Sequence, residues 1–139
     1  MRLAVLLALL PCLVHAEPLQ RTEAPAPILE RLQAEAARNG ELFDSAAAWE
    51  IDLEGDGTTE WLVQAAYPFP GGNAVYVRTY LFDGADQGYG ESADIGLDRS
   101  LKRVERSGRD LSLVIYEMLP NDARCCPSGE STRTLSIGN

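Results

Sequence analysis

From residue 46 onward, apolar and polar side chains alternate with a period of two. Trp49, Ile51 and Leu53 are separated by Glu50 and Asp52. Successive side chains of a β-strand point to opposite faces of the sheet, so this period indicates strands rather than helices. Repetition of the pattern between turn-forming residues predicts strands over residues 49–53, 61–65, 75–82, 89–97, 101–106, 111–119 and 132–137.

One helix is expected before the strands. Pro27 is a favourable first-turn residue, Ile28, Leu29, Leu32 and Ala36 share one helical face, and Asn39-Gly40 is a typical helix end. The predicted fold is α+β and mostly β: an antiparallel sheet of about six or seven short strands, covered on one face by this N-terminal amphipathic helix.

Residues 1–16 have the features of an export signal: a basic start at Arg2, an apolar run from Leu3, and Val14-His15-Ala16 as a cleavage site. An alternative is a lipid anchor on Cys12, which the preceding Pro11 disfavours. We expect a periplasmic or secreted protein with no membrane span, because the apolar run is shorter than about 20 residues. Residues 17–26 have linker composition, and residues 27–139 are predicted to form a single globular domain.

Charge and histidine content restrict the possible functions. The formal net charge is −9, and removal of residues 1–16 takes away one arginine and no acid, giving −10. Such a surface disfavours nucleic acid and suits cations or a basic protein partner. The only histidine is His15, so the mature chain could not use histidine for catalysis or for binding zinc. We therefore expect a protein that is not an enzyme.

The segment from Asp52 to Glu60 places acidic residues at loop positions 1, 3, 5 and 9 and glycines at 4 and 6. An EF-hand requires flanking helices and a glutamate at position 12, which is Val63 here. The loop instead resembles the calcium loop of FG-GAP/VCBS-type repeats. That resemblance covers about 15 residues and implies a structural calcium ion held by Asp52, Glu54, Asp56, Glu60 and the Thr58 carbonyl. The alternative is an acidic hairpin turn without an ion.

Two adjacent cysteines, Cys125 and Cys126, remain in the mature chain. Export to an oxidising compartment favours a disulfide, and one between neighbours would cross-link no distant segments. Other possibilities are intermolecular pairing, free thiols, a redox switch, or a soft-metal site to which Met118 could add a third sulfur. The string Cys-Cys-Pro-Ser resembles a group of small exported bacterial proteins of unassigned function.

Three further features concern packing or binding. Phe69, in the loop Tyr67–Asn73, is either an interface anchor or a cap on the core. Trp49 and Trp61 are expected to point into the core from adjacent strands. A basic cluster is either a solvated hairpin face or a self-association surface; it comprises Arg99, Lys102, Arg103, Arg106 and Arg109.

Together these observations predict an exported, non-enzymatic, calcium-stabilised module that acts by binding a protein. The alternative function is thiol–disulfide exchange or soft-metal handling through Cys125 and Cys126. A hydrolase that uses carboxylates and calcium is a third possibility.

Overall fold

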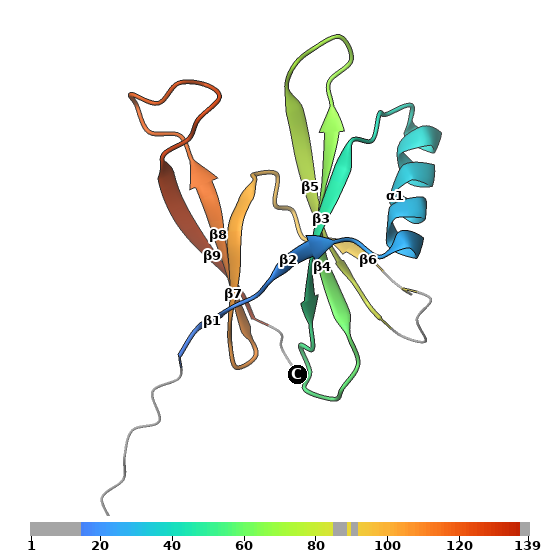
Figure 1. The fold of residues 1–139 in the computed structure, drawn as a ribbon, viewed down its shortest axis with the longest axis vertical. Helices are drawn as coiled ribbons and strands as arrows, with labels where there is room; N and C mark the ends of the chain where they lie inside the picture. Colours follow the sequence, from blue (N-terminus) through green and yellow to red (C-terminus); the bar gives the residue numbers. More distant parts are fainter. Residues whose placement is uncertain (1–14, 85–88, 90–91, 137–139) are drawn as a thin grey trace, which may run out of the picture.

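The computed structural model describes residues 15–84, 89 and 92–136 (Figure 1). All but the last two residues of the predicted export signal lie outside this part of the chain. The elements are β1 Glu17–Pro18, β2 Arg21–Glu23, α1 Ala26–Asn39, β3 Ser45–Ile51, β4 Glu60–Pro68, β5 Val75–Phe82, β6 Ser92–Asp94, β7 Leu101–Ser107, β8 Asp110–Glu117 and β9 Gly129–Ser136.

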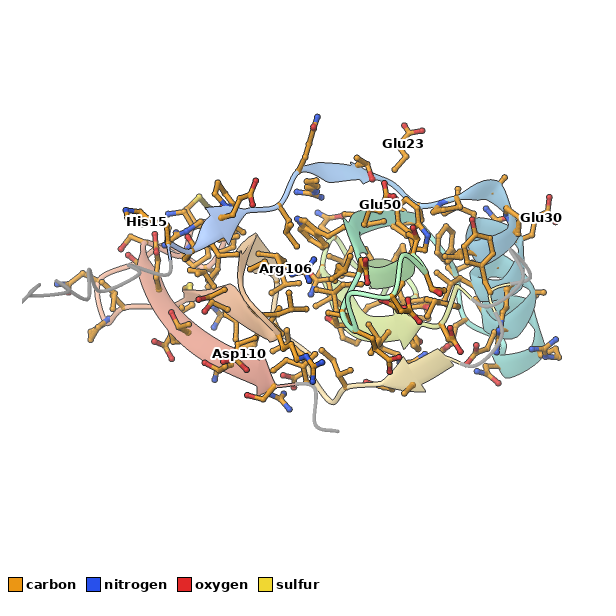
Figure 2. All side chains as sticks on the ribbon, turned by 90° about the horizontal axis from the view of Figure 1, so that it is seen from below. His15, Glu23, Glu30, Glu50, Arg106 and Asp110 are labelled. Carbon is orange, nitrogen blue, oxygen red and sulfur yellow. A yellow bond between two sulfur atoms is a disulfide. The ribbon has the colours of Figure 1, made fainter. Side chains whose placement is uncertain are left out.

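The strands form two antiparallel sheets instead of one. Their orders are β1-β7-β8-β9 and β2-β3-β4-β5-β6. The predicted class, mostly β with a single helix, is confirmed, but the described residues contain nine strands rather than six or seven. Figure 1 shows the five-stranded sheet between α1 and the four-stranded sheet, so the molecule has three layers. Figure 2 views the layers along the strands, with Glu30 on the outer side of α1.

Both faces of the five-stranded sheet are buried. Within β4, Val63 packs with the α1 core, while its neighbour Leu62 packs with the core between the two sheets. An antiparallel sheet commonly leaves one face to water; here α1 covers one face and the four-stranded sheet covers the other. The strand pattern predicted a single core between one sheet and the helix. The structure instead has two cores, one on each face of the five-stranded sheet.

The two tryptophans therefore point into different layers. Trp49 pairs with Leu62 and Trp61 pairs with Glu50, an offset of one residue that places the indoles on opposite faces. Trp49 is fully buried between the sheets, and Trp61 is partly buried on the α1 side. Both pack against core residues, as expected, but not in the same core.

The helix closely follows its prediction. It begins at Ala26, one residue before Pro27, and buries Ile28, Leu32 and Ala36. It ends at Gly40, whose φ of 68° is left-handed and whose N–H donates to the Ala36 and Ala37 carbonyls. This cap satisfies carbonyl groups that the helix itself leaves unpaired.

Residues 17–26, predicted from composition to be a linker, contain β1 and β2. Glu17 pairs with Arg106 in β7, and Arg21 pairs with Trp49 in β3. Between them, the Leu19 N–H donates to the Val104 carbonyl at 2.8 Å. The segment thus crosses from the edge of one sheet to the edge of the other (Figure 1). These pairings join residues far apart in the chain, which is why local composition does not reveal them.

Several predicted strand boundaries differ from the structure: β3 ends at Ile51 and not at Leu53, β4 continues to Pro68, and β8 ends at Glu117 and not at Leu119. In the segment 89–97, the described strand is β6, and it ends before Gly96, whose N–H donates to the Asp94 side chain at 2.8 Å. Residues 90–91 lie outside the described part of the chain. The last strand starts at Gly129, earlier than predicted, and Ile137 lies outside the described part. The hairpin turn predicted at residues 107–110 is confirmed, with Gly108 at φ 63°.

A buried polar network joins the two sheets. The Gln64 amide nitrogen donates to the Thr79 hydroxyl at 2.8 Å and to the Arg99 carbonyl at 3.0 Å. Its amide oxygen accepts the Leu101 N–H at 2.9 Å. Thr79 is fully buried and donates to the Leu97 carbonyl at 3.1 Å. One side chain of β4 thereby fixes the segment that leads from the five-stranded sheet into β7.

No helix of the described residues is long and apolar enough to cross a membrane.

Candidate functional site

The acidic loop connects β3 to β4 and is closed by Asp52. Its Oδ1 accepts the N–H groups of Gly55 at 2.7 Å and Asp56 at 3.2 Å, and its Oδ2 accepts that of Gly57 at 3.1 Å. Gly55 and Gly57 have φ values of 72° and 86°, which glycine adopts without strain. The Asp-x-x-Gly-x-Gly spacing therefore specifies a turn that wraps around one carboxylate.

Two further carboxylates also accept backbone N–H groups. Asp56 Oδ1 accepts the Thr58 N–H at 2.7 Å, and this bond holds the pKa of Asp56 below its usual value. Glu60 Oε2 accepts the Leu53 N–H at 2.7 Å. Burial raises the pKa of Glu60 above its usual value, and the negative charges of Asp52, Asp56 and Glu54 raise it further. The loop thus concentrates negative potential at Glu60, which a cation would relieve.

The five predicted calcium ligands therefore share one turn: Asp52, Glu54, Asp56, Thr58 and Glu60. Carboxylate and carbonyl oxygens are the donors that calcium prefers, so the donor chemistry fits this ion. In the described conformation, Asp52, Asp56 and Glu60 bond to the turn's own backbone. No group of three His, Cys, Asp or Glu side chains in the described residues is arranged around a common metal position. Calcium binding thus requires these side chains to turn toward the ion.

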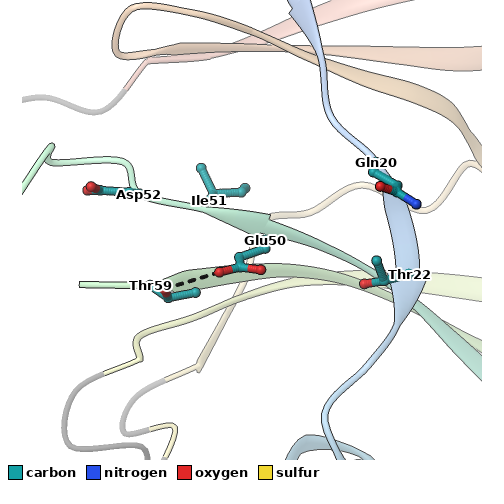
Figure 3. A pocket seen from close by; sticks show the side chains of 6 residues that line it. All are labelled: Gln20, Thr22, Glu50, Ile51, Asp52 and Thr59. Atoms are coloured by element: carbon teal, nitrogen blue, oxygen red, sulfur yellow. Dashed lines mark hydrogen bonds between the residues drawn. The ribbon is translucent and has the colours of Figure 1, made fainter. Parts of the chain in front are cut away.

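A hollow of about 360 Å³ lies beside the acidic loop (Figure 3). Gln20 and Thr22 come from the segment that crosses between the sheets, and Glu50, Asp52 and Thr59 come from the β3–β4 hairpin. The Thr59 hydroxyl donates to Glu50 Oε1 at 3.4 Å. The hollow thus combines two carboxylates with neutral polar groups and Ile51, so its charge is negative.

Gly84, which follows β5, fixes the other side of the acidic loop. A Cβ on this residue would lie 1.6 Å from the Thr59 carbonyl oxygen, so only glycine fits. No sequence pattern indicated this contact, because Gly84 and Thr59 belong to different strand connections.

The second candidate site is the loop between β8 and β9. Cys125 and Cys126 form a disulfide with a Cα–Cα distance of 3.8 Å, so the predicted vicinal pair is present. Both residues are exposed. A bond between sequence neighbours closes almost no chain loop and contributes little stability by restricting the unfolded chain.

Asp122 holds this loop together. Its Oδ2 accepts the N–H groups of Leu119 at 2.8 Å and Ser128 at 2.7 Å, and its Oδ1 accepts the Ser128 hydroxyl at 2.6 Å. These bonds, led by the Ser128 hydroxyl, lower the pKa of Asp122. A further turn forms where the Cys126 N–H donates to the Ala123 carbonyl at 2.9 Å. The sequence analysis did not identify Asp122, because nothing local indicated that its side chain would reach Ser128 six residues later.

The exposed large apolar side chains gather at one end of the molecule. α1 and β8 end there, and the β4–β5 and β8–β9 loops project from it, at the top of Figure 1. We call residues 40–44, 69–75 and 116–128 the apolar end. It contains every exposed large apolar residue of the described chain: Leu42, Phe69, Val75, Tyr116, Met118 and Leu119. The acidic loop lies at the opposite end of the strands.

Phe69 is both packed and exposed. Its ring centroid lies 5.0 Å from that of Tyr76, yet 49% of the residue remains accessible. The turn that carries it is closed by the Phe69 N–H donating to the Ala74 carbonyl at 3.0 Å. Phe69 thus packs against Tyr76 and still presents an apolar surface to solvent.

The basic cluster is largely neutralised by ion pairs. Lys102 pairs with Glu130, and Arg103 pairs with Glu130 at 2.9 Å and with Glu105 at 2.7 Å. Arg99 contacts Glu117 at 3.1 Å, and Arg106 donates to the Gly108 carbonyl. The cluster therefore does not form a continuous patch of unpaired positive charge.

No protein-family model, curated protein or solved structure matches this chain in sequence or fold comparisons.

Proposed function

We propose that this chain is an exported, non-enzymatic module that binds a protein partner through its apolar end and is stabilised by calcium in the acidic loop. The distribution of exposed apolar residues supports this proposal most directly. Six large apolar side chains are exposed at one end of the strands, on connecting loops and on the ends of β5 and β8. Exposed apolar groups on loops that a rigid sheet supports are typical of binding surfaces.

The calcium component is supported by the electrostatics of the loop. Four acidic residues lie within nine positions, and three of them raise the pKa of Glu60. A divalent cation would remove this repulsion and would tie β3 to β4 at the end opposite the binding surface. The role of the ion is to stabilise the scaffold, because the apolar end lies at the other end of the strands.

Partner binding is tested with the purified protein immobilised and exposed to the exported fraction of its own cell. The Phe69→Ser variant is compared with Leu29→Ser, a partly buried apolar residue of α1 away from the apolar end. We expect one protein to be retained by the wild type and by Leu29→Ser but at least about tenfold less by Phe69→Ser, as for a buried aromatic anchor. Equal retention by all three proteins would contradict the proposal.

Calcium is tested by thermal unfolding with excess calcium and with a chelator. At 100 times its dissociation constant, the ion adds about 2.7 kcal/mol, or roughly 10 °C for a domain of this size. The Asp56→Asn variant keeps an oxygen to accept the Thr58 N–H but loses the charge, so its calcium shift should fall. Glu30→Gln, an exposed change on α1, is the charge control. A wild-type shift below about 1 °C would reduce the loop to an acidic turn.

A second candidate function is thiol–disulfide exchange or soft-metal handling through Cys125 and Cys126. Exposure of both residues on a loop that Asp122 holds closed favours it, because a reducing thiol can reach the bond without unfolding the protein. Intact mass after mild reduction and alkylation tests this function. Two added groups at a potential near that of cellular dithiols would support it, and a bond that resists reduction until the protein unfolds would exclude it.

A further inference from the structure

The apolar end contains a hollow of about 510 Å³ where β8 runs into the β8–β9 loop. Arg99 and Ser100 precede β7; Tyr116, Glu117 and Met118 lie at the end of β8; and Arg124 and Pro127 come from the loop. Its volume lies within the range of about 300–1,000 Å³ that is usual for ligand sites. The lining combines apolar surface with guanidinium groups, in contrast to the acidic hollow at the other end of the strands.

Two arginines give this hollow donors that the protein does not use. Arg124 has no hydrogen bond or ion pair with the residues that the structure describes. Arg99 contacts Glu117 through Nη1 alone, at 3.1 Å. A guanidinium presents five N–H donors in a planar fork that matches a carboxylate. Lining carboxylates come from Glu117 only, so the charge within the hollow is positive although the whole chain is acidic.

The apolar part of the hollow is also open to a ligand. Tyr116 is 37% exposed and Met118 is 48% exposed. The Lys102 ammonium lies 5.6 Å from the Tyr116 ring centroid and pairs with Glu130, which fixes the ring from the sheet side. Methionine adapts its shape to apolar partners. An apolar side chain could therefore rest against Tyr116 and Met118, within reach of the arginines.

The loop is held in place before any ligand binds. The Asp122 carboxylate bonds to Leu119 and Ser128 at either end of the segment that carries Arg124 and Pro127. A loop that is already ordered loses little conformational entropy on binding. The hollow is therefore a formed site rather than one that its ligand must assemble.

We propose that this hollow binds an acidic segment of the partner protein, in which a carboxylate stands beside a large apolar side chain. The proposal deepens the proposed function and rests on it. The carboxylate pairs with Arg124 and Arg99, and the apolar side chain covers Tyr116 and Met118. The net charge alone suggested a basic partner, but the lining of the hollow contains two guanidinium groups and one carboxylate, so the charge inside the hollow favours an acidic segment.

The test measures fluorescence anisotropy of labelled, end-capped peptides on addition of the purified protein. The probe is Gly-Glu-Phe-Glu-Gly, compared with Gly-Gln-Phe-Gln-Gly and Gly-Lys-Phe-Lys-Gly. We expect the acidic peptide to bind at least about tenfold more tightly than either of the others, because hydrogen bonds to charged groups are about twice as strong as neutral ones. Binding should weaken as the salt concentration rises.

Variants assign the binding to the hollow. Arg124→Gln should weaken binding of the acidic peptide about tenfold, and Arg124→Lys should weaken it less. Met118→Ser should weaken binding of the same peptide by removing the apolar contact. Arg38→Gln, at the exposed C-terminal end of α1, makes the same change of charge outside the hollow and should have no effect. Arg124 is exposed and unpaired within the described chain, so these variants should fold normally.

Several results would overturn the assignment. They are no binding of the acidic peptide at millimolar protein, equal binding of the glutamine peptide, or equal losses in Arg124→Gln and Arg38→Gln. If free 3-phenylpropionate binds as tightly as the acidic peptide, the ligand of the hollow is a small carboxylic acid and not a protein segment. If the partner found with the wild type is retained equally by Arg124→Gln but lost by Phe69→Ser, the proposed function stands and this inference fails.

Discussion

Glu41 and Arg78 form a two-bond ion pair between the end of α1 and the middle of β5. Arg78 Nη2 lies 2.6 Å from Glu41 Oε1, and Nη1 lies 2.8 Å from Oε2. The Tyr76 hydroxyl donates to the same Oε1 at 2.7 Å. The guanidinium also lies 5.0 Å from the Tyr67 ring centroid. The pair therefore anchors the segment after the helix onto an aromatic surface of the sheet.

This pair makes stability depend on pH. Hydrogen bonds from Arg78 and then Tyr76 lower the pKa of Glu41 from 4.5 to about 2. A carboxyl group whose pKa is lower in the folded than in the unfolded chain stabilises fully above the unfolded value and loses this effect as pH falls through the folded value. Glu41→Gln should lower the free energy of unfolding by about 1 kcal/mol at pH 6. This value is modest because the ion pair is partly exposed.

Urea unfolding of the wild type and Glu41→Gln at several pH values measures this effect. The difference between the two proteins should shrink between pH 4.5 and about 2. Glu30→Gln, on the outer side of α1, should show no such convergence. A difference that stays constant with pH would show that Glu41 acts through packing and not through its charge.

Gly84→Ala should strongly destabilise the protein. The added methyl would meet the Thr59 carbonyl at 1.6 Å, so the backbone of the acidic loop must move. We expect a loss of at least about 2 kcal/mol in chemical denaturation, within the range for overpacked sites. Gly72→Ala is the matched control, because its Cβ would meet its nearest neighbour at an ordinary 3.7 Å. Similar stability of the two variants would contradict the contact between Gly84 and Thr59.

The Gln64 network should behave as a coupled unit. Gln64→Met keeps the length of the side chain but removes the donor to the Thr79 hydroxyl and the acceptor of the Leu101 N–H, which should lower the unfolding free energy by about 2–3 kcal/mol. Thr79→Val should cost less when Gln64 is already methionine. A double-mutant cycle on unfolding free energies should show coupling of about 1 kcal/mol. Additive effects would mean that the two side chains are held independently.

The β8–β9 loop should depend on Asp122 more than on the disulfide. Replacing both Cys125 and Cys126 by serine should change the melting temperature by less than about 2 °C, because the bond joins sequence neighbours. Asp122→Ala removes the acceptor of three hydrogen bonds and should lower it by more. If the double serine variant is the less stable of the two, the disulfide and not Asp122 maintains the loop.

Sequence patterns predicted those parts of the fold that local chemistry controls. Gly40 ends the helix because glycine accepts a left-handed φ, and Gly108 closes the β7–β8 hairpin for the same reason. The adjacency of Cys125 and Cys126 in an exported chain favoured the disulfide that the structure contains. In the acidic loop, the predicted residues share one turn, while calcium binding itself stays a prediction.

Other features depend on contacts between distant segments. A period of two shows that Leu62 and Val63 face opposite ways, but it cannot show that both faces are covered. Polar Gln64 reads as a solvent-facing residue, and only the tertiary fold brings Leu101 to its amide. The two short strands before α1 exist because of their partners, so residues 17–26 carried no strand pattern of their own.

Because both faces of the five-stranded sheet are buried, the residues that stabilise the fold are separate from the residues of the exposed loops. Residues that stabilise the fold lie between the layers, whereas the β4–β5 and β8–β9 loops contribute few of them. Mutations in these loops can accumulate at low cost to folding. Changes in these loops alone could therefore alter what the protein binds, and an engineer could replace residues 69–74 and 123–127, leaving Asp122 in place, to give the same scaffold a new specificity.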